Sequence, residues 1–161
     1  GDLDMDDELY LRIVELKTAA LFAACGELGA VLAKGTEAQR AALAEYGMNL
    51  GIAFQIRDDT LDWIGQECTM GKPIQVDLDQ GRLSLAVLHA LKRSAGMVET
   101  LRSGDQARVI RMLRDTGALD YAAQQARSYA EAAISCLSVL PESEARNELR
   151  RLVDYAVVRD R

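Results

Sequence analysis

Residues 46–62 read Tyr46-Gly-Met-Asn-Leu-Gly-Ile-Ala-Phe-Gln-Ile-Arg-Asp-Asp-Thr-Leu-Asp62, within a predicted helix over about residues 37–64 that is largely buried before its acidic end. Gly47 and Gly51 are four residues apart and therefore share one helix face. A glycine inside a helix costs about 1 kcal/mol relative to alanine. Two of them on one face indicate that another helix or a ligand approaches closely there.

The composition favours helices along the whole chain. The 161 residues include 24 alanines, two prolines and eight aromatic residues, so helix formers are abundant and strand formers are sparse. Apolar periodicity and glycine or proline stops predict a loop at 65–81 and further helices over about 8–32, 83–95, 105–114, 119–140 and 144–158. We therefore predict an all-α bundle of about six helices.

The first predicted helix carries an apolar face whose residues recur every three or four positions: Leu9, Ile13, Leu16, Ala20 and Ala24. We expect the aspartates that precede this helix to cap its N-terminus. Lys17 and Thr18 interrupt the apolar stretch. A lysine that faces the interior needs a carboxylate or an anion as its partner.

The charge balance excludes some classes of function. There are 25 acidic and 19 basic residues, a net charge of −6, so no general positive surface for nucleic acid is expected. No apolar run approaches the length of about 18 residues that a transmembrane helix needs. The acidic N-terminus is unlike a signal peptide, and three cysteines fit no metal motif. We expect a cytoplasmic protein with reduced thiols.

The helix over 37–64 ends in an acidic cluster. Asp58 and Asp62 are four residues apart on one face, and Asp59 is adjacent. Like charges at this spacing are destabilising unless a positive group compensates, and Mg²⁺ prefers hard oxygen ligands that it shares with phosphates. A D-D-x-x-D pattern would arise by chance with a probability of about 0.1 in a chain this rich in aspartate. The apolar run before it makes a magnesium–diphosphate site the sharper prediction, with Asp58, Asp59 and Asp62 as its ligands.

A second lysine, Lys72, follows Gly71 in the predicted loop, where it could fold over a phosphate. A lone lysine is more often a solvated or snorkelling side chain. Taken in order, however, these residues resemble the trans-isoprenyl diphosphate synthases, the polyprenyl synthetase family. The similarity runs through Tyr10-Leu, Lys17-Thr18, Tyr46-Gly-x-x-Leu-Gly-x-Ala-Phe54-Gln55-Ile-x-Asp58-Asp59-x-x-Asp62, Gly71-Lys72, Asp77-Leu-x-x-Gly81, Leu-His89-Ala-Leu, Thr116-Gly117-Ala118-Leu119 and Val158-Arg-Asp-Arg161.

The resemblance implies the all-helical isoprenoid synthase fold with a central cavity, of which residues 1–161 would be a single partial domain, the C-terminal half. It implies a prenyltransferase that condenses isopentenyl diphosphate with an allylic diphosphate and releases pyrophosphate. Two aspartate-rich motifs hold Mg²⁺ across the cavity in this family, and Asp58, Asp59 and Asp62 match the second motif.

The same resemblance assigns roles to the remaining site residues. Lys17 and Lys72 match the lysines that contact the allylic diphosphate. Thr18, Phe54 and Gln55 match residues of the same pocket, where Gln55 would stabilise the carbocation or the leaving group. Small residues such as Ala53 and the helix glycines would leave room for the isoprenoid chain.

The chain also departs from the family pattern. Family enzymes are about twice as long, and the first aspartate-rich motif and the basic residues for isopentenyl diphosphate belong to the half that is missing here. Leu83-Ser-Leu-Ala86 replaces a sequence that usually resembles Thr-Leu-Pro. We therefore expect the chain to be inactive alone, and to work as a homodimer or with an N-terminal half chain.

Two alternatives stay open. The first is a non-catalytic or regulatory subunit derived from the family, although degenerate members usually lose the aspartates that this chain keeps. The second is a class I terpene cyclase, which shares the aspartates and the fold but lacks the Lys-Thr, Phe-Gln and Gly-Lys pairs at these spacings.

Overall fold

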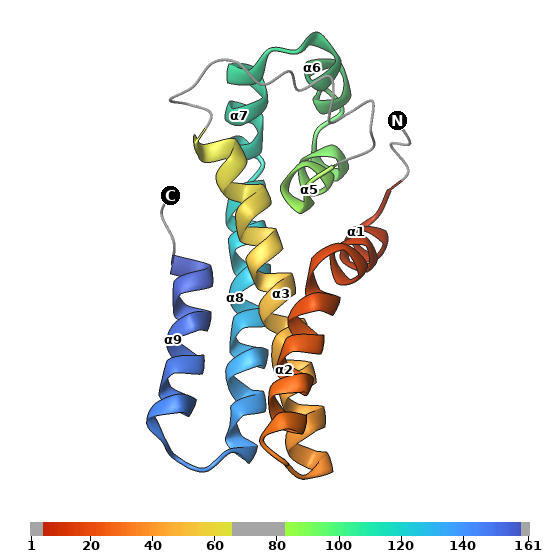
Figure 1. The fold of residues 1–161 in the computed structure, drawn as a ribbon. Coiled ribbons are helices and arrows are strands. Elements are labelled where there is room, and N and C mark those ends of the chain that lie inside the picture. The colour runs from red at the N-terminus through yellow and green to blue at the C-terminus, as the bar shows by residue number, and fades with distance from the viewer. Residues whose placement is uncertain (1–4, 66–82, 159–161) are drawn as a thin grey trace.

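The computed structural model of the chain describes residues 5–65 and 83–158, and this described part contains helices and no strand. The elements, in chain order, are α1 (Asp7–Val14), the π-helical turn η1 (Glu15–Ala19), α2 (Ala20–Leu32), α3 (Glu37–Gly65), α5 (Leu85–Arg93), α6 (Met97–Ser103), α7 (Gln106–Asp115), α8 (Ala118–Cys136), the 3-10 turn η2 (Leu137–Val139) and α9 (Glu144–Val158). The predicted all-α fold class is confirmed (Figure 1).

The predicted boundaries hold for most helices, with two differences. The helix expected over 8–32 contains the π-helical turn η1, and the short α6 was not predicted. A seven-residue helix offers fewer than two full turns of periodicity, so its pattern is hard to recognise. Its end is nevertheless marked in the sequence, because Gly104 takes a left-handed conformation after its last turn. The predicted loop at 65–81 lies almost wholly outside the described residues.

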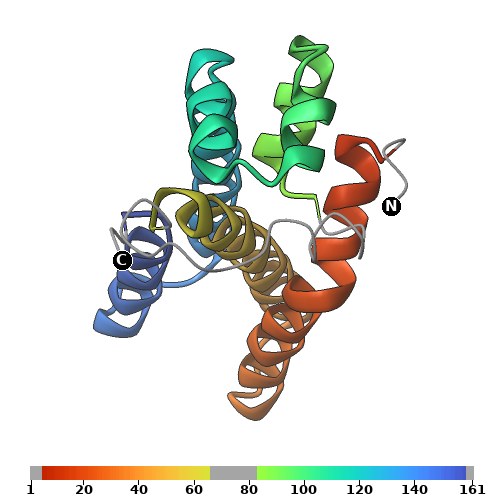
Figure 2. The same cartoon turned by 90° about the horizontal axis from the view of Figure 1, so that it is seen from above.

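Helix α3 is the central element of the fold. It packs chiefly against α2 on one side and α8 on another, and α9 contacts both α3 and α8 (Figures 1 and 2). The upper core, around Ile56, Leu88 and Leu113, joins α3 to α1, α5, α7 and α8. The lower core, around Tyr46, Leu137 and Val153, joins α3 to α8 and α9. Both cores thus depend on α3.

The glycines of α2 and α3 allow two helix backbones to touch. A Cβ atom on Gly47 would lie 2.3 Å from the carbonyl oxygen of Phe22, and one on Gly51 would lie 2.5 Å from the Cα of Ala19. The close approach predicted for this face is therefore made by a helix. The expectation that these glycines leave room for an isoprenoid chain is wrong, because backbone fills that space. Ala53 is fully buried in the lower core.

The π-helical turn shifts the register of the first helix by one residue. Its buried face steps by four residues from Tyr10 to Val14 and then by five to Ala19. The exposed face likewise steps by five, from Leu16 to Leu21. A step of five is the hydrogen-bonding step of a π-helix, so both faces stay aligned across the turn.

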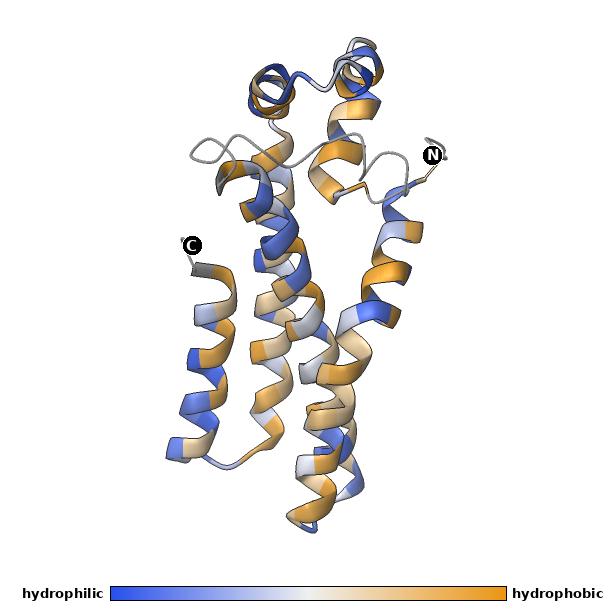
Figure 3. Cartoon of the chain, turned by 45° about the horizontal axis from the view of Figure 1, so that its top comes forward, coloured by the Kyte–Doolittle hydropathy of each residue, from blue (hydrophilic) through white to orange (hydrophobic). Residues whose placement is uncertain are grey.

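The apolar face predicted from the sequence points away from the core. Its members Leu9, Ile13, Leu16, Ala20 and Ala24 are all exposed, and the exposure continues at Leu21, Leu28, Val31 and Leu32. We call the exposed leucines and isoleucine of this face, Leu9, Ile13, Leu16, Leu21, Leu28 and Leu32, the apolar stripe. Figure 3 shows apolar residues along most of the length of α2. Within the described residues, no helix is long and apolar enough to cross a membrane.

Candidate functional site

The candidate site lies where α1 and the π-helical turn η1 meet the C-terminal half of α3. Three hydrogen bonds between side chains connect these elements. The hydroxyl of Tyr10 donates to Oδ2 of Asp59 over 2.7 Å. Nε2 of Gln55 donates to Oδ1 of Asp59 over 2.8 Å, and the hydroxyl of Thr18 donates to Oε1 of Gln55 over 2.7 Å. We call this series the Tyr10–Asp59–Gln55–Thr18 network.

Local helix geometry places the members of the network. Gln55 and Asp59 are one turn apart on α3, so their side chains meet on one face. Tyr10 comes from α1, and Thr18 comes from the π-helical turn η1 itself. Gln55 is buried, and its amide oxygen and nitrogen are both hydrogen-bonded, which buried polar groups require.

The carboxylate of Asp59 has a perturbed pKa. Burial raises it above the usual value, and the neighbouring charge of Asp58 acts in the same direction. The hydrogen bonds from Tyr10 and Gln55 and the positive charge of Lys17 act in the opposite direction. Burial also raises the pKa of Tyr10, as does the charge of Asp59, so the Tyr10 hydroxyl stays protonated and remains a donor.

Of the two other aspartates of the motif, Asp62 is more accessible than Asp59. Asp62 is exposed and Asp58 is half-buried, one turn apart near the C-terminal end of α3. Across residues 5–65 and 83–158, no three acidic, histidine or cysteine side chains are grouped closely enough to hold a metal ion. The donor set still suits Mg²⁺, which binds through one or two carboxylates together with waters and substrate phosphates.

The structure brings most of the predicted site residues to one region. Lys17 lies on η1 and is exposed, and its positive charge acts to lower the pKa of Asp59. Thr18 and Gln55 are hydrogen-bonded to each other. Phe54 is half-buried beside Phe22 of α2, with ring centroids 5.8 Å apart. Lys72 lies outside the described residues.

Tyr10 is the member of this region for which the sequence analysis predicted no role. The quoted motif contained Tyr10, but its partner Asp59 is 49 positions away. The sequence feature that could have indicated a role is a tyrosine, with its polar hydroxyl, among the aliphatic residues of the first predicted helix. The contact between Tyr10 and Asp59 exists only because α1 packs on α3, which the sequence feature does not show.

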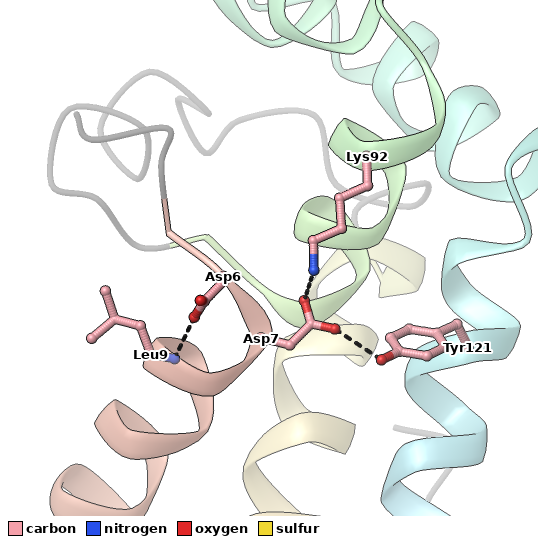
Figure 4. Close-up of polar contacts among 5 residues, drawn as sticks. All are labelled: Asp6, Asp7, Leu9, Lys92 and Tyr121. Carbon is pink, nitrogen blue, oxygen red and sulfur yellow. Dashed lines mark hydrogen bonds and ion pairs between the residues drawn. The ribbon is translucent and has the colours of Figure 1, made fainter.

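A second polar cluster lies at the start of α1 (Figure 4). One oxygen of Asp7 accepts a hydrogen bond from Lys92 of α5 at 2.7 Å, and the other accepts one from the hydroxyl of Tyr121 of α8 at 2.9 Å. His89 stacks on the ring of Tyr121, with centroids 4.1 Å apart. Asp6 accepts a hydrogen bond from the backbone nitrogen of Leu9, so the predicted aspartate cap is confirmed.

Comparison with known proteins identifies relatives along the whole chain. Residues 1–113 match the family model described as Polyprenyl synthetase. The short chain isoprenyl diphosphate synthase of Methanothermobacter thermautotrophicus is 37% identical over 98% of this chain and 51% of its own length. The geranylfarnesyl diphosphate synthase of Aeropyrum pernix is 42% identical over 98% of this chain and 52% of its own.

A solved structure gives the same result. The polyprenyl synthase from Caulobacter crescentus, crystallised in complex with calcium and isoprenyl diphosphate, superimposes with a TM-score of 0.86 and 36% identity. The alignment covers 99% of this chain and 52% of that structure. The chain therefore spans about half the length of the relatives it matches.

Proposed function

The chain belongs to the polyprenyl synthetase family and corresponds to the C-terminal half of a trans-isoprenyl diphosphate synthase, and from this premise we propose that it supplies half of a prenyltransferase site. The complete site condenses isopentenyl diphosphate with an allylic diphosphate. The observation that carries the proposal is the convergence of Thr18, Gln55 and Asp59, with Lys17 close by, at the acidic end of α3.

The three aspartates form the acidic part of the site. Asp58 and Asp62 would hold Mg²⁺. Asp59, the third predicted ligand, has both carboxylate oxygens hydrogen-bonded, to Tyr10 and to Gln55, and would add its charge to the site. When bound, Mg²⁺ neutralises the negative charge that develops on the leaving diphosphate. The chain itself contributes the carboxylates and their fixed spacing on one helix.

The remaining residues bind and protect the substrate. Lys17 presents an exposed ammonium group that attracts the diphosphate, and Lys72 would approach it from the segment after α3. Thr18 and Gln55 offer hydroxyl and amide dipoles to a cationic intermediate or to the departing diphosphate. Phe54 contributes an apolar wall near this pocket, and the site must exclude water, because water would capture an allylic cation.

The apolar stripe supports the proposed need for a partner. It places six large apolar side chains on the surface of α1, η1 and α2, where a partner could bury them. We propose that a second copy of the chain or an N-terminal half chain covers it, and that the isolated chain is inactive. We also propose a cytoplasmic location, for which the free thiols of Cys25 and Cys136 are the support.

The experiment that tests this function is magnesium-dependent binding of inorganic pyrophosphate to the chain, measured by titration calorimetry. The parent chain should bind pyrophosphate only with Mg²⁺ present, and Asp58→Ala should abolish that binding. Asp154→Ala is the matched control, because Asp154 is an exposed aspartate on α9, away from the site. Absence of binding at millimolar pyrophosphate would favour a regulatory subunit instead.

In the complete enzyme, Asp58→Ala should lower the rate of pyrophosphate release by about 100-fold or more, since a metal-holding carboxylate acts at the leaving group. A rate within about threefold of the parent would overturn the assignment of Asp58. Consumption of isopentenyl diphosphate separates chain elongation from the cyclase alternative.

A further inference from the structure

We propose that Tyr10 is a positioning residue of this site, which acts through Asp59 to set the orientation of the Gln55 amide and of the Thr18 hydroxyl. The proposal rests on the proposed function and adds a residue that the aspartate motif does not contain. It assigns Asp59 the role of an anchor for neighbouring side chains, distinct from the metal-holding role of Asp58 and Asp62.

The first step is the contact between Tyr10 and Asp59. The ring of Tyr10 is only 3% exposed and belongs to the upper core, so packing fixes where its hydroxyl can be. That hydroxyl donates to Oδ2 of Asp59 over 2.7 Å. This hydrogen bond fixes one oxygen of the Asp59 carboxylate, Oδ2, next to α1.

The second step passes from Asp59 to Gln55. An ionised carboxylate can only accept hydrogen bonds, so the amide nitrogen of Gln55 must face Oδ1 of Asp59. The amide oxygen then faces the opposite way and accepts from the hydroxyl of Thr18. The network therefore determines the orientation of an amide that could otherwise turn over.

The third step determines which polar groups of Thr18 and Gln55 remain available to bind a substrate. Because Thr18 uses its only hydroxyl hydrogen on Gln55, its oxygen can only accept a further hydrogen bond. Gln55 keeps one amide hydrogen that no hydrogen bond of the network uses. Thr18 lies next to Lys17 in η1, so the same network holds the turn that carries the proposed diphosphate lysine.

Removal of the Tyr10 hydroxyl should disturb each step in sequence. Tyr10→Phe keeps the packed ring and leaves Oδ2 of Asp59 without this donor. The carboxylate is then free to rotate, and the Gln55 amide loses the constraint on its orientation. Displacements of about 1 Å in such positions can cost about 100-fold in rate.

Tyr46 provides a matched control. It is 4% exposed, and its hydroxyl donates to the carbonyl oxygen of Leu149 over 2.8 Å in the lower core. Burial raises the pKa of Tyr46 to about 12, so it is a protonated donor at neutral pH, like Tyr10. Tyr46→Phe therefore removes a comparable hydrogen bond at a distance from Gln55 and Thr18.

The first test measures the hydrogen bonding of the Gln55 side-chain amide and needs no assay of activity. The Gln55 side-chain amide proton that is bonded to Asp59 should exchange slowly with solvent in NMR spectra of the parent chain and of Tyr46→Phe. In Tyr10→Phe the exchange of this proton should be faster by about tenfold or more, since its partner Asp59 is no longer held by Tyr10. Equal exchange in all three proteins would overturn the proposed network, whatever the activity.

The second test uses the complete enzyme that contains this sequence. Tyr10→Phe and Tyr46→Phe should lower the melting temperature by a similar amount of about 2–5 °C. Only Tyr10→Phe should lower kcat, by about 10- to 100-fold, with KM for the allylic diphosphate changed less than about threefold. Equal kcat values for the two variants would mean that Tyr10 is merely structural.

A double-mutant cycle tests whether Tyr10 acts through the network. In a Thr18→Val background, Tyr10→Phe should lower kcat by less than about twofold, because the last member of the series is already lost. Independent, multiplying effects would contradict the proposal. A parent enzyme that shows the Gln55 protection but no prenyl transfer would overturn the proposed function and leave the network itself intact.

Discussion

At the scale of single residues, Asp7 shows how one carboxylate can join three helices. It begins α1 and accepts hydrogen bonds from Lys92 of α5 and Tyr121 of α8. Burial tends to raise its pKa, but the Lys92 and Tyr121 hydrogen bonds and the charge of Lys92 outweigh burial and lower it below 3.8. Asp7 therefore stabilises the fold in its ionised form.

This assignment predicts a pH-dependent stability difference. Asp7→Asn should lower the free energy of unfolding at pH 7 by about 1 kcal/mol, since an ion pair and a hydrogen bond are weakened. A depressed pKa gives stabilisation that is present above the unfolded-state value of 3.8 and is lost as pH falls through the folded-state value. The difference between Asp7→Asn and the parent should therefore shrink below about pH 4 in urea unfolding.

Asp6→Asn is the control for this measurement. Asp6 caps α1, and asparagine caps helices about as well as aspartate, so its effect at pH 7 should be within about 0.5 kcal/mol. A constant difference between Asp7→Asn and the parent from pH 7 to pH 2 would contradict the role given to the Asp7 charge.

At the scale of elements, the contact between α2 and α3 depends on glycine. Gly26 and Gly29 are both in α2, but their surroundings differ. A Cβ atom on Gly26 would lie 2.2 Å from the carbonyl oxygen of Leu43, whereas one on Gly29 would meet nothing within 4 Å. Of these two glycines of α2, Gly26 is the one that the close approach of the backbones requires.

Substitution by alanine should therefore change the free energy of unfolding in opposite directions at Gly26 and at Gly29. Gly26→Ala should lower the free energy of unfolding by about 1–3 kcal/mol or more, because α3 must move away. Gly29→Ala should raise it by up to about 1 kcal/mol, since alanine is the better helix former. Urea unfolding of the two variants measures both, and destabilisation by Gly29→Ala equal to that of Gly26→Ala would contradict the packing of α2 on α3.

At the scale of the whole molecule, the apolar stripe is the feature that the fold leaves uncovered. Leu21 is 70% exposed, and Leu28 lies two turns further along α2. If a second copy buries this stripe, Leu21→Gln with Leu28→Gln should weaken association by tenfold or more, because each buried leucine contributes about 1.5–3 kcal/mol. Sedimentation velocity over a concentration series measures the change.

Leu152→Gln is the control for this prediction. Leu152 is also an exposed leucine, 53% accessible, but it lies on α9, far along the chain from the stripe. None of these substitutions should change the stability of the monomer by more than about 0.5 kcal/mol. Dissociation by Leu152→Gln, or a parent chain that is monomeric at every concentration, would contradict an interface at the stripe.

Tertiary packing of η1 on α3 brings Lys17 and Thr18 to the site, whereas local pattern in the sequence determined the helical class, most helix positions and the grouping of Gln55 with the aspartates near one end of α3. These features follow from propensities and from spacings of three or four residues, which act over a single helix.

Tertiary structure decided which helix faces are buried and which distant residues meet, because a local sequence pattern holds no information on either. The face at Leu9, Ile13 and Leu16 has the periodicity of a core face, yet the π-helical turn and the packing of α2 on α3 leave it exposed. Likewise, Tyr10 and Asp59 meet across 49 positions only because α1 packs on α3. The physical reason is the same in both cases: periodicity identifies an apolar face, but only the competition among all helices for burial selects which face each one covers.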